Sequence, residues 1–153
     1  MERAEALASL VSTARSYVIH RSKRSSEADP WEHFDTWAVR LEHNEVIVSE
    51  GNTPYVKMKF PLTTENSWNG NVFNSGPADQ YEYTAVALPL ELNGLTFENT
   101  ITVEQEDNED RIVFRDERKE IYALHVGLIY KEVIQLNYCT DDACLGQQKI
   151  DHG

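Results

Sequence analysis

Apolar and polar residues alternate along most of the chain after residue 35. In PYVKMKF, for example, Val56, Met58 and Phe60 fall on one face, and the residues between them fall on the other. A period of two residues is typical of a β-strand with one buried face. Strand-like segments of this kind are TWAVRLE, EVIVSEGN, PYVKMKF, QYEYTAVALPL, GLTFENTITVEQE and RIVFR. They predict an antiparallel, all-β fold of about eight strands.

The longest strand-like stretch is EIYALHVGLIYKEVIQLNY, residues 120–138, in which Gly127 is the single break. One straight strand of this length would far exceed the usual length of about five or six residues. The stretch therefore predicts two consecutive strand segments, or one long bent strand, with Gly127 at a bulge or a sharp bend.

The N-terminal segment has a different pattern, with apolar residues spaced i, i+3, i+4 and i+7. This spacing places them on one face of a helix and predicts a short helix within residues 1–15. The residues concerned are Leu7, Leu10, Val11 and Ala14. Farther along, residues 22–35 are polar and contain Pro30, so we predict a loop there, with Trp31 and Phe34 contacting the core.

These elements favour a strongly curved antiparallel sheet or a flattened β-barrel, with a β-sandwich as the alternative. The length of 153 residues is typical of one domain. We expect a single domain over residues 1–153, with a helical segment at 1–15 and an antiparallel β domain at 16–153.

The charge balance disfavours two classes of partner. The chain carries 26 acidic and 14 basic residues, for a net charge of −12. Nucleic acids and anionic membrane surfaces both require clustered Lys and Arg, so we expect neither as a partner. No apolar run approaches the roughly 20 residues of a membrane-spanning helix. The first residues lack the pattern of a signal peptide, which leaves a cytosolic protein or a mature secreted one.

Two cysteines, Cys139 and Cys144, flank a turn-rich segment in YCTDDACLG. A chain reversal at Asp141 and Asp142 would bring them within disulfide range, and a pair of free thiols is the alternative. Zinc sites usually combine two pairs of ligands, and no second pair is visible, so we expect neither a metal nor a cofactor.

Several segments of the chain resemble a group of uncharacterised cell-envelope lipoproteins of Bacteroidetes. The resemblance covers about residues 17–153. It lies in W-x-x-R from residue 37, EGNTPYVKMKFPL (50–62), SWNGNVFN (67–74), LTFENTITVEQED (95–107) and KEIYALHVGLIYKE (119–132). The resemblance implies an exported protein at the periplasm or outer membrane, and it implies no activity.

The chain departs from the pattern of that group at three places. His125 stands where glycine is usual, ahead of Val126 and Gly127. The first 15 residues replace a signal peptide and a lipid-bearing cysteine, so any membrane link would require an anchor absent from this chain. The end at IDHG falls where a further strand is expected, which suggests a truncated β domain.

The residues offer no recognisable catalytic set, because the motifs of serine hydrolases, zinc proteases and nucleotide-binding enzymes are absent from the sequence. We expect His125 to lie in a strand, as a structural histidine or facing a cavity. Glu132 interrupts an apolar register that includes Tyr130. It is either an edge charge or an inward carboxylate with a raised pKa that marks a site. The acidic run EQEDNED, residues 104–110, lacks the spacing of a Ca²⁺ loop and predicts a solvated hairpin tip.

The most distinctive loop is WNGN around Trp68. Trp68 is expected to plug one end of the curved sheet, and the alternative is an aromatic platform formed with Phe73 and Tyr81. The sequence as a whole favours a non-catalytic envelope module that binds an apolar or peptide-like ligand, or docks on an envelope protein. A small hydrolase with a site on the concave face of the sheet is the alternative.

Overall fold

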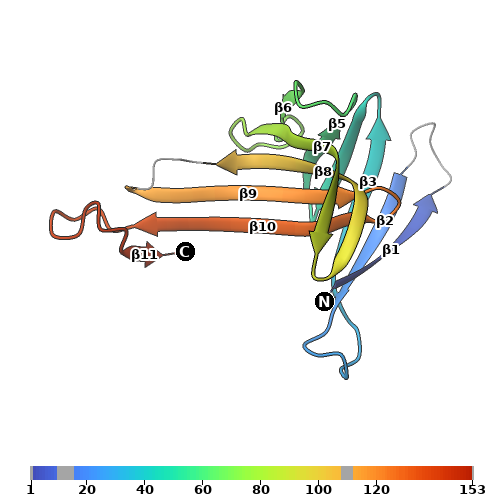
Figure 1. The fold of residues 1–153 in the computed structure, drawn as a ribbon, viewed down its shortest axis with the longest axis horizontal. Coiled ribbons are helices and arrows are strands. Elements are labelled where there is room, and N and C mark those ends of the chain that lie inside the picture. The colour runs from blue at the N-terminus through green and yellow to red at the C-terminus, as the bar shows by residue number, and fades with distance from the viewer. Residues whose placement is uncertain (1, 10–15, 108–111, 153) are drawn as a thin grey trace. The chain divides into compact units, whose positions relative to one another are not determined.

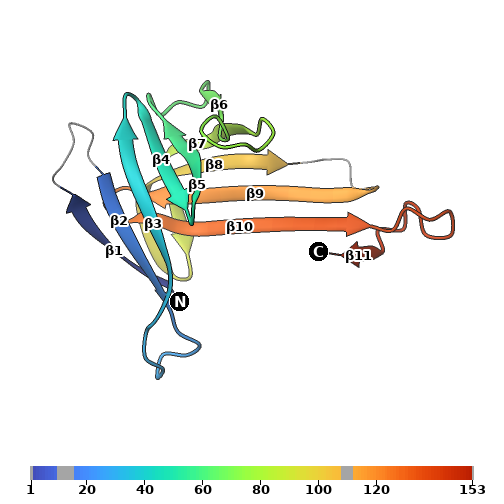
Figure 2. The ribbon, with the colours of Figure 1, turned by 180° about the vertical axis from the view of Figure 1, so that it is seen from behind.

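The computed structural model describes residues 2–9, 16–107 and 112–152, and its strands form two antiparallel sheets (Figures 1 and 2). In the first sheet the strands are adjacent in chain order, β1-β2-β3-β4-β5. Their bounds are β1 Glu2–Ser9, β2 Ser16–Lys23, β3 Glu32–Glu42, β4 Glu45–Glu50 and β5 Thr53–Lys59.

The second sheet has the order β11-β10-β9-β8-β7-β6, which again follows the chain. Its strands are β6 Ser67–Asn69, β7 Gln80–Leu92, β8 Leu95–Asp107, β9 Phe114–Ala123, β10 Gly127–Tyr138 and β11 Ile150–His152. Chain-order neighbours and short turns are expected where period-two segments are separated by turn residues. The prediction of an all-β, antiparallel fold is therefore confirmed.

Neither sheet closes into a barrel over the described residues, so the prediction of a flattened barrel is wrong. Closure would require the first and last strands of one sheet to pair. Instead, β1 and β5 end the first sheet, and β6 and β11 end the second. The same part of the chain contains no helix that could cross a membrane.

The chain divides into two compact units. The first comprises residues 1–61 and 69–78, and the second comprises residues 62–68 and 79–153. The boundary is crossed three times, and the short strand β6 contains residues of both units. Whether the two units act as the single domain that the length indicates stays a prediction.

The prediction of an N-terminal helix is wrong for residues 2–9, which form β1. This strand pairs with β2 at every position from Glu2 opposite Lys23 to Ser9 opposite Ser16. Helices of so few residues are marginal in water, whereas a neighbouring strand offers partners to the backbone groups. Residues 10–15, which the predicted helix also included, lie outside the described residues.

The predicted loop at residues 22–35 is shorter in the structure, because β2 extends to Lys23 and β3 begins at Glu32. Phe34 lies within β3 and is 47% exposed, so it is not part of the core. Trp31 is half-buried, and the guanidinium carbon of Arg24 lies 4.6 Å from the centre of its ring.

Residues 120–138 form two strand segments, as the sequence predicted. β9 ends at Ala123, and β10 begins at Gly127 and runs back beside it. The amide of Val126 donates to the carbonyl of Ala123 at 3.1 Å and closes the turn. Gly127 has φ +97°, which a residue without a side chain adopts readily. Gly127 therefore lies at a sharp reversal of the chain.

Candidate functional site

Trp68 and Tyr81 belong to an aromatic cluster in the core of the second unit, together with Tyr83. Their exposed fractions are 5%, 1% and 2%, respectively. The centre of the Trp68 ring lies 6.1 Å from that of Tyr81 and 4.8 Å from that of Tyr83, with the rings inclined. Such edge-on and tilted pairs are favourable ways to pack aromatic rings. These rings are covered, and their contact with a ligand stays a prediction.

Phe73 lies in the first unit, on the loop that follows β6. Its side chain is 43% exposed, and the guanidinium carbon of Arg40 lies 5.4 Å from the ring centre. The loop is held to β5 because the side-chain amide of Asn74 donates to the carbonyl of Pro54 at 2.9 Å. Phe73 is thus a surface residue on an anchored loop.

Tyr130 and Glu132 meet on β10, together with Lys119 of β9. The hydroxyl of Tyr130 donates to Glu132 Oε2, and Lys119 Nζ lies 3.1 Å from Glu132 Oε1. The hydrogen bond from Tyr130, and then the one from Lys119, hold the pKa of Glu132 below its ordinary value. Of the two alternatives for Glu132, the inward carboxylate with a raised pKa is therefore wrong, because the group is partly exposed and stabilised in its charged form. The edge-charge alternative stays a prediction.

A second carboxylate, which the sequence analysis missed, is buried on β9. Glu120 is 1% exposed and accepts a hydrogen bond of 2.5 Å from the hydroxyl of Tyr122. Lys131 of β10 places its ammonium group 3.1 Å from Glu120 Oε1. Lys131 is the cross-strand partner of Glu120 in the β9–β10 register, so only knowledge of that register could have revealed the pair.

His125 lies in the turn between β9 and β10, not in a strand as the sequence predicted. Its φ of +64° is in the left-handed region that few residues with side chains adopt. The turn stands beside a step in the sheet, where β8 extends beyond the end of β9. The pairing of β8 with β9 ends at Thr100 opposite Ala123, whereas β8 itself begins at Leu95. The amide of Leu124 donates across this step to the carbonyl of Asn99 at 3.0 Å.

A pocket of about 270 Å³ lies at the step, and residues 96–99 and 123–126 line it. Phe97, Leu124 and Val126 contribute apolar surface, while His125 and Glu98 contribute polar groups. The turn therefore forms one wall of the pocket and the first residues of β8 form the other. His125 is the one predicted contact residue that lies at this pocket.

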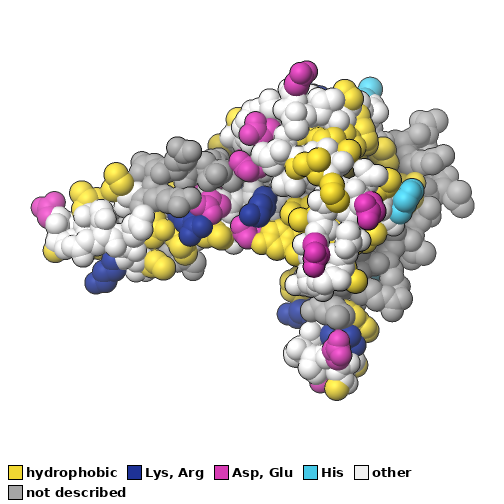
Figure 3. All heavy atoms as spheres, in the orientation of Figure 1, with side chains coloured by type: hydrophobic (Ala, Val, Ile, Leu, Met, Phe, Trp, Pro, Cys, Tyr) yellow, Lys and Arg dark blue, Asp and Glu magenta, His cyan; other side chains and the backbone are white. Residues whose placement is uncertain are grey.

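Exposed apolar residues are frequent in this part of the second sheet. Leu124 and Val126 are 61% and 64% exposed, and Leu95, at the start of β8, is 63% exposed. Figure 3 shows, without distinguishing individual residues, that hydrophobic and acidic side chains are interspersed on the face of the molecule that it presents. Large exposed apolar residues beside a pocket are typical of binding surfaces.

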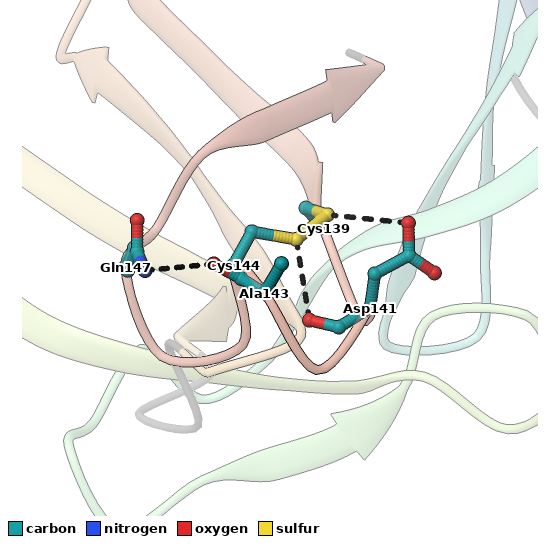
Figure 4. Close-up of a disulfide and its surroundings, with 5 residues drawn as sticks. All are labelled: Cys139, Asp141, Ala143, Cys144 and Gln147. Atoms are coloured by element: carbon teal, nitrogen blue, oxygen red, sulfur yellow. Dashed lines mark hydrogen bonds between the residues drawn. A yellow bond between two sulfur atoms is a disulfide. The ribbon is translucent and has the colours of Figure 1, made fainter.

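Cys139 and Cys144 form a disulfide, as the sequence predicted (Figure 4). Their Cα atoms are 5.9 Å apart, and the intervening turn is closed by the amide of Cys144, which donates to the carbonyl of Asp141 at 2.9 Å. A carboxylate oxygen of Asp141 lies close to both sulfur atoms. Metal ligation requires thiolates, so the disulfide form of this group is not a metal site.

Comparisons of the chain with protein-family models, with curated proteins and with solved structures found no match.

Proposed function

We propose that this chain is an exported, non-catalytic binding module of the cell envelope that accepts an apolar side chain of a partner in the pocket beside residues 124–126. The observation that carries the proposal is the pocket itself, at a step of the sheet with large apolar residues exposed around it. The partner class is a protein or peptide with an exposed aromatic or branched residue.

The volume of the pocket favours a side chain over a large ligand. Sites for drug-sized molecules have volumes of about 300–1,000 Å³. An apolar cavity of about 150 Å³ already accepts benzene. The volume of about 270 Å³ lies between these values and leaves room for one aromatic or branched side chain.

The rim of the pocket supports contact with a larger body. Leu124 and Val126 stand on the turn and leave most of their side-chain surface in water. Burial of apolar surface contributes roughly 25 cal/mol per Å². Binding energy at protein interfaces concentrates where an anchor residue enters a pocket within a ring of contacts that exclude water. The pocket can receive the anchor residue, and the exposed side chains of Leu124 and Val126 can form contacts around it.

The proposed location is supported by the disulfide and by the resemblance of segments 50–62, 67–74 and 119–132 to envelope lipoproteins. Disulfides persist in oxidising compartments such as the periplasm. The non-catalytic role is supported by the pocket lining, in which the titratable side chains of His125 and Glu98 are both exposed to solvent.

An NMR titration tests the proposal with a side-chain mimic, N-acetyl-L-phenylalaninamide. We expect the amide signals of residues 96–99 and 123–126 to shift together and to saturate. Val126→Ser should weaken binding, whereas Val133→Ser, which alters another exposed valine of the same unit, should not. Absence of saturable shifts at these amides would refute the proposal, as would equal weakening by both substitutions.

A further inference from the structure

Two histidines lie together on the first sheet, although they are 13 positions apart in the sequence. His20 belongs to β2 and His33 to β3, and these strands pair side by side (Figure 1). The centres of the two rings are 6.3 Å apart and the rings are inclined at 64°. Both side chains are exposed, as is Thr36 between them.

A β-bulge brings these side chains to one face. In a regular strand, residues 33 and 36 would point to opposite faces, because side chains alternate. Here Arg21 pairs with Asp35 and Ser22 pairs with His33, so Phe34 is an extra residue in β3. The extra residue resets the alternation and re-aims the side chains that follow. Thr36 is opposite His20, and His33 is opposite Ser22, so His20, His33 and Thr36 share a face.

The two imidazoles converge on one point. His20 Nδ1 and His33 Nε2 each lie 3.4 Å from the hydroxyl oxygen of Thr36. Hydrogen bonds in proteins usually measure about 2.7–3.2 Å, so both contacts are long and weak. Two ring nitrogens directed at the same place from neighbouring strands are the arrangement of a bidentate metal chelate.

We propose that His20 and His33 form a surface binding site for a divalent transition metal ion such as Zn²⁺ or Cu²⁺. Imidazole nitrogen is a preferred ligand of both ions. With metal–nitrogen distances of about 2.0–2.1 Å, the ring centres of two imidazoles on one metal lie roughly 5–6 Å apart. The observed 6.3 Å is close to this range, so a small side-chain rotation completes the chelate.

The surroundings of the pair are compatible with a bound cation. Arg21, which follows His20 in β2, belongs to the opposite face. There its Nη1 lies 3.7 Å from Asp35 Oδ2 and its guanidinium carbon lies 3.9 Å from the centre of the Trp37 ring. The remaining coordination positions of the metal stay open to water, as in sites with few protein ligands. This site is in the first unit and does not depend on the proposed pocket.

Isothermal titration of the full, tag-free chain with ZnCl₂ tests the site. We expect one Zn²⁺ to bind per chain, and His20→Ala and His33→Ala each to weaken its affinity by more than about tenfold, as loss of a ligand exceeds loss of a supporting contact. His43→Asn is the matched control, because His43 is an exposed histidine in the β3–β4 turn with φ +54°, which Asn tolerates. The Zn²⁺ affinity of the His43→Asn variant should equal that of the wild type.

A second readout separates binding at this pair from binding elsewhere. On addition of Zn²⁺, the imidazole carbon and proton signals of His20 and His33 should shift together, with the same saturation. The proposal is overturned if no Zn²⁺ binds, if both alanine variants keep wild-type affinity, or if the loss follows one histidine alone. Circular dichroism of each variant confirms that the sheet is intact.

Discussion

Arg118 of β9 binds Asp79, the residue before β7, through two parallel hydrogen bonds. Nη1 donates to Oδ2 at 2.7 Å and Nη2 donates to Oδ1 at 3.1 Å, while Nε donates to Asp116 at 2.8 Å. The side chains of Arg118 and Asp79 are 18% and 10% exposed. Burial alone would lower the pKa of Arg118, but the bonds to Asp79 and Asp116 outweigh it, and the pKa is raised. This pair ties the entry of β7 to the middle of the second sheet.

Loss of this arginine should destabilise the protein. Arg118→Ala removes the guanidinium from two partly buried carboxylates, so we expect a loss of about 2–4 kcal/mol in the free energy of unfolding. Arg118→Lys keeps the charge and loses the two-pronged geometry, so its effect should be smaller. Urea denaturation measures both. Arg40→Ala is the control, because the Arg40–Glu42 pair is much more exposed and should contribute less than about 1 kcal/mol. Equal effects of Arg118→Ala and Arg40→Ala would contradict the interpretation.

The contacts of Glu132 with Tyr130 and Lys119 should make the free energy of unfolding depend on pH. The folded-state pKa of Glu132 lies below its ordinary value of 4.5, so the stabilisation is present above that value and is lost as the pH falls through the folded-state pKa. We expect Glu132→Gln to reduce stability at neutral pH and the difference from the wild type to shrink in acid. Urea midpoints at several pH values below 7 measure it. A difference that stays constant or grows in acid would refute this.

Tyr130 offers an independent view of the same cluster. Its pKa is raised above the ordinary value of 10.0, first because its hydroxyl donates to Glu132 and then because of burial. In the Glu132→Gln variant the pKa of Tyr130 should fall back toward that value. NMR titration of the labelled tyrosine ring in alkaline solution measures the shift. An unchanged Tyr130 titration would show that Glu132 is not its acceptor.

The disulfide should stabilise the short segment of residues 139–149, between β10 and β11. A disulfide that closes a loop this short contributes about 2 kcal/mol to the free energy of unfolding in the chain-entropy treatment. The amide of Cys139 donates to the carbonyl of Lys149 at 2.8 Å, which ties the loop to the residues before β11. We expect Cys139→Ser with Cys144→Ser to raise hydrogen exchange in residues 139–149 and to leave β2–β4 unchanged. Uniform exchange changes in both units would contradict a local role.

The two units should unfold together, because the chain passes between them three times. The first unit needs residues 69–78, which follow residues 62–68 of the second unit. The second unit needs residues 79–153, which follow residues 69–78 of the first. The three tryptophans allow a direct test after labelling with 5-fluorotryptophan, since Trp31 and Trp37 belong to the first unit and Trp68 to the second. Their fluorine signals should lose native intensity at one urea concentration. Separate midpoints would show two independently folding units and would contradict the single domain that the length predicts.

Much of the strand pattern was predictable, because half-buried strands reveal themselves by alternation. Segments 37–42, 45–50, 53–59 and 95–103 all lie in strands of the structure. The reversal at Gly127 was predictable for the same reason, since a single glycine interrupts two strand-like segments. In both cases the signal is local, and neighbouring residues carry it.

The errors arise where pairing decides the outcome. The apolar spacing near the N-terminus fits a helix, yet residues 2–9 pair with β2 along its whole length. The sequence analysis predicted no strand at residues 16–23 and placed residues 22 and 23 in a loop, so β2 was missed. Propensity is a weak guide when a neighbouring strand supplies the backbone hydrogen bonds.

The candidate sites depend on register, which the sequence does not display. The pairing of β8 with β9 stops at Thr100 opposite Ala123, whereas β8 itself begins at Leu95. The five residues 95–99 extend beyond that pairing, and the pocket lies beside them. The histidine pair exists because Phe34 is an extra residue in β3. Of the predicted contact residues, His125 was identified as a histidine in a strand-like segment that could face a cavity. Phe97 and Leu124 gave no signal that separates them from ordinary strand residues.

Filling the pocket tests the proposed function most directly. Thr96 lines the pocket and is exposed, so Thr96→Trp should fold normally and occupy the space that the partner side chain needs. Thr84→Trp adds the same ring at an exposed position of β7 outside the lining. The measurement is the affinity of N-acetyl-L-phenylalaninamide for both variants. We predict wild-type affinity for Thr84→Trp and no detectable binding for Thr96→Trp; wild-type affinity in Thr96→Trp would contradict the account.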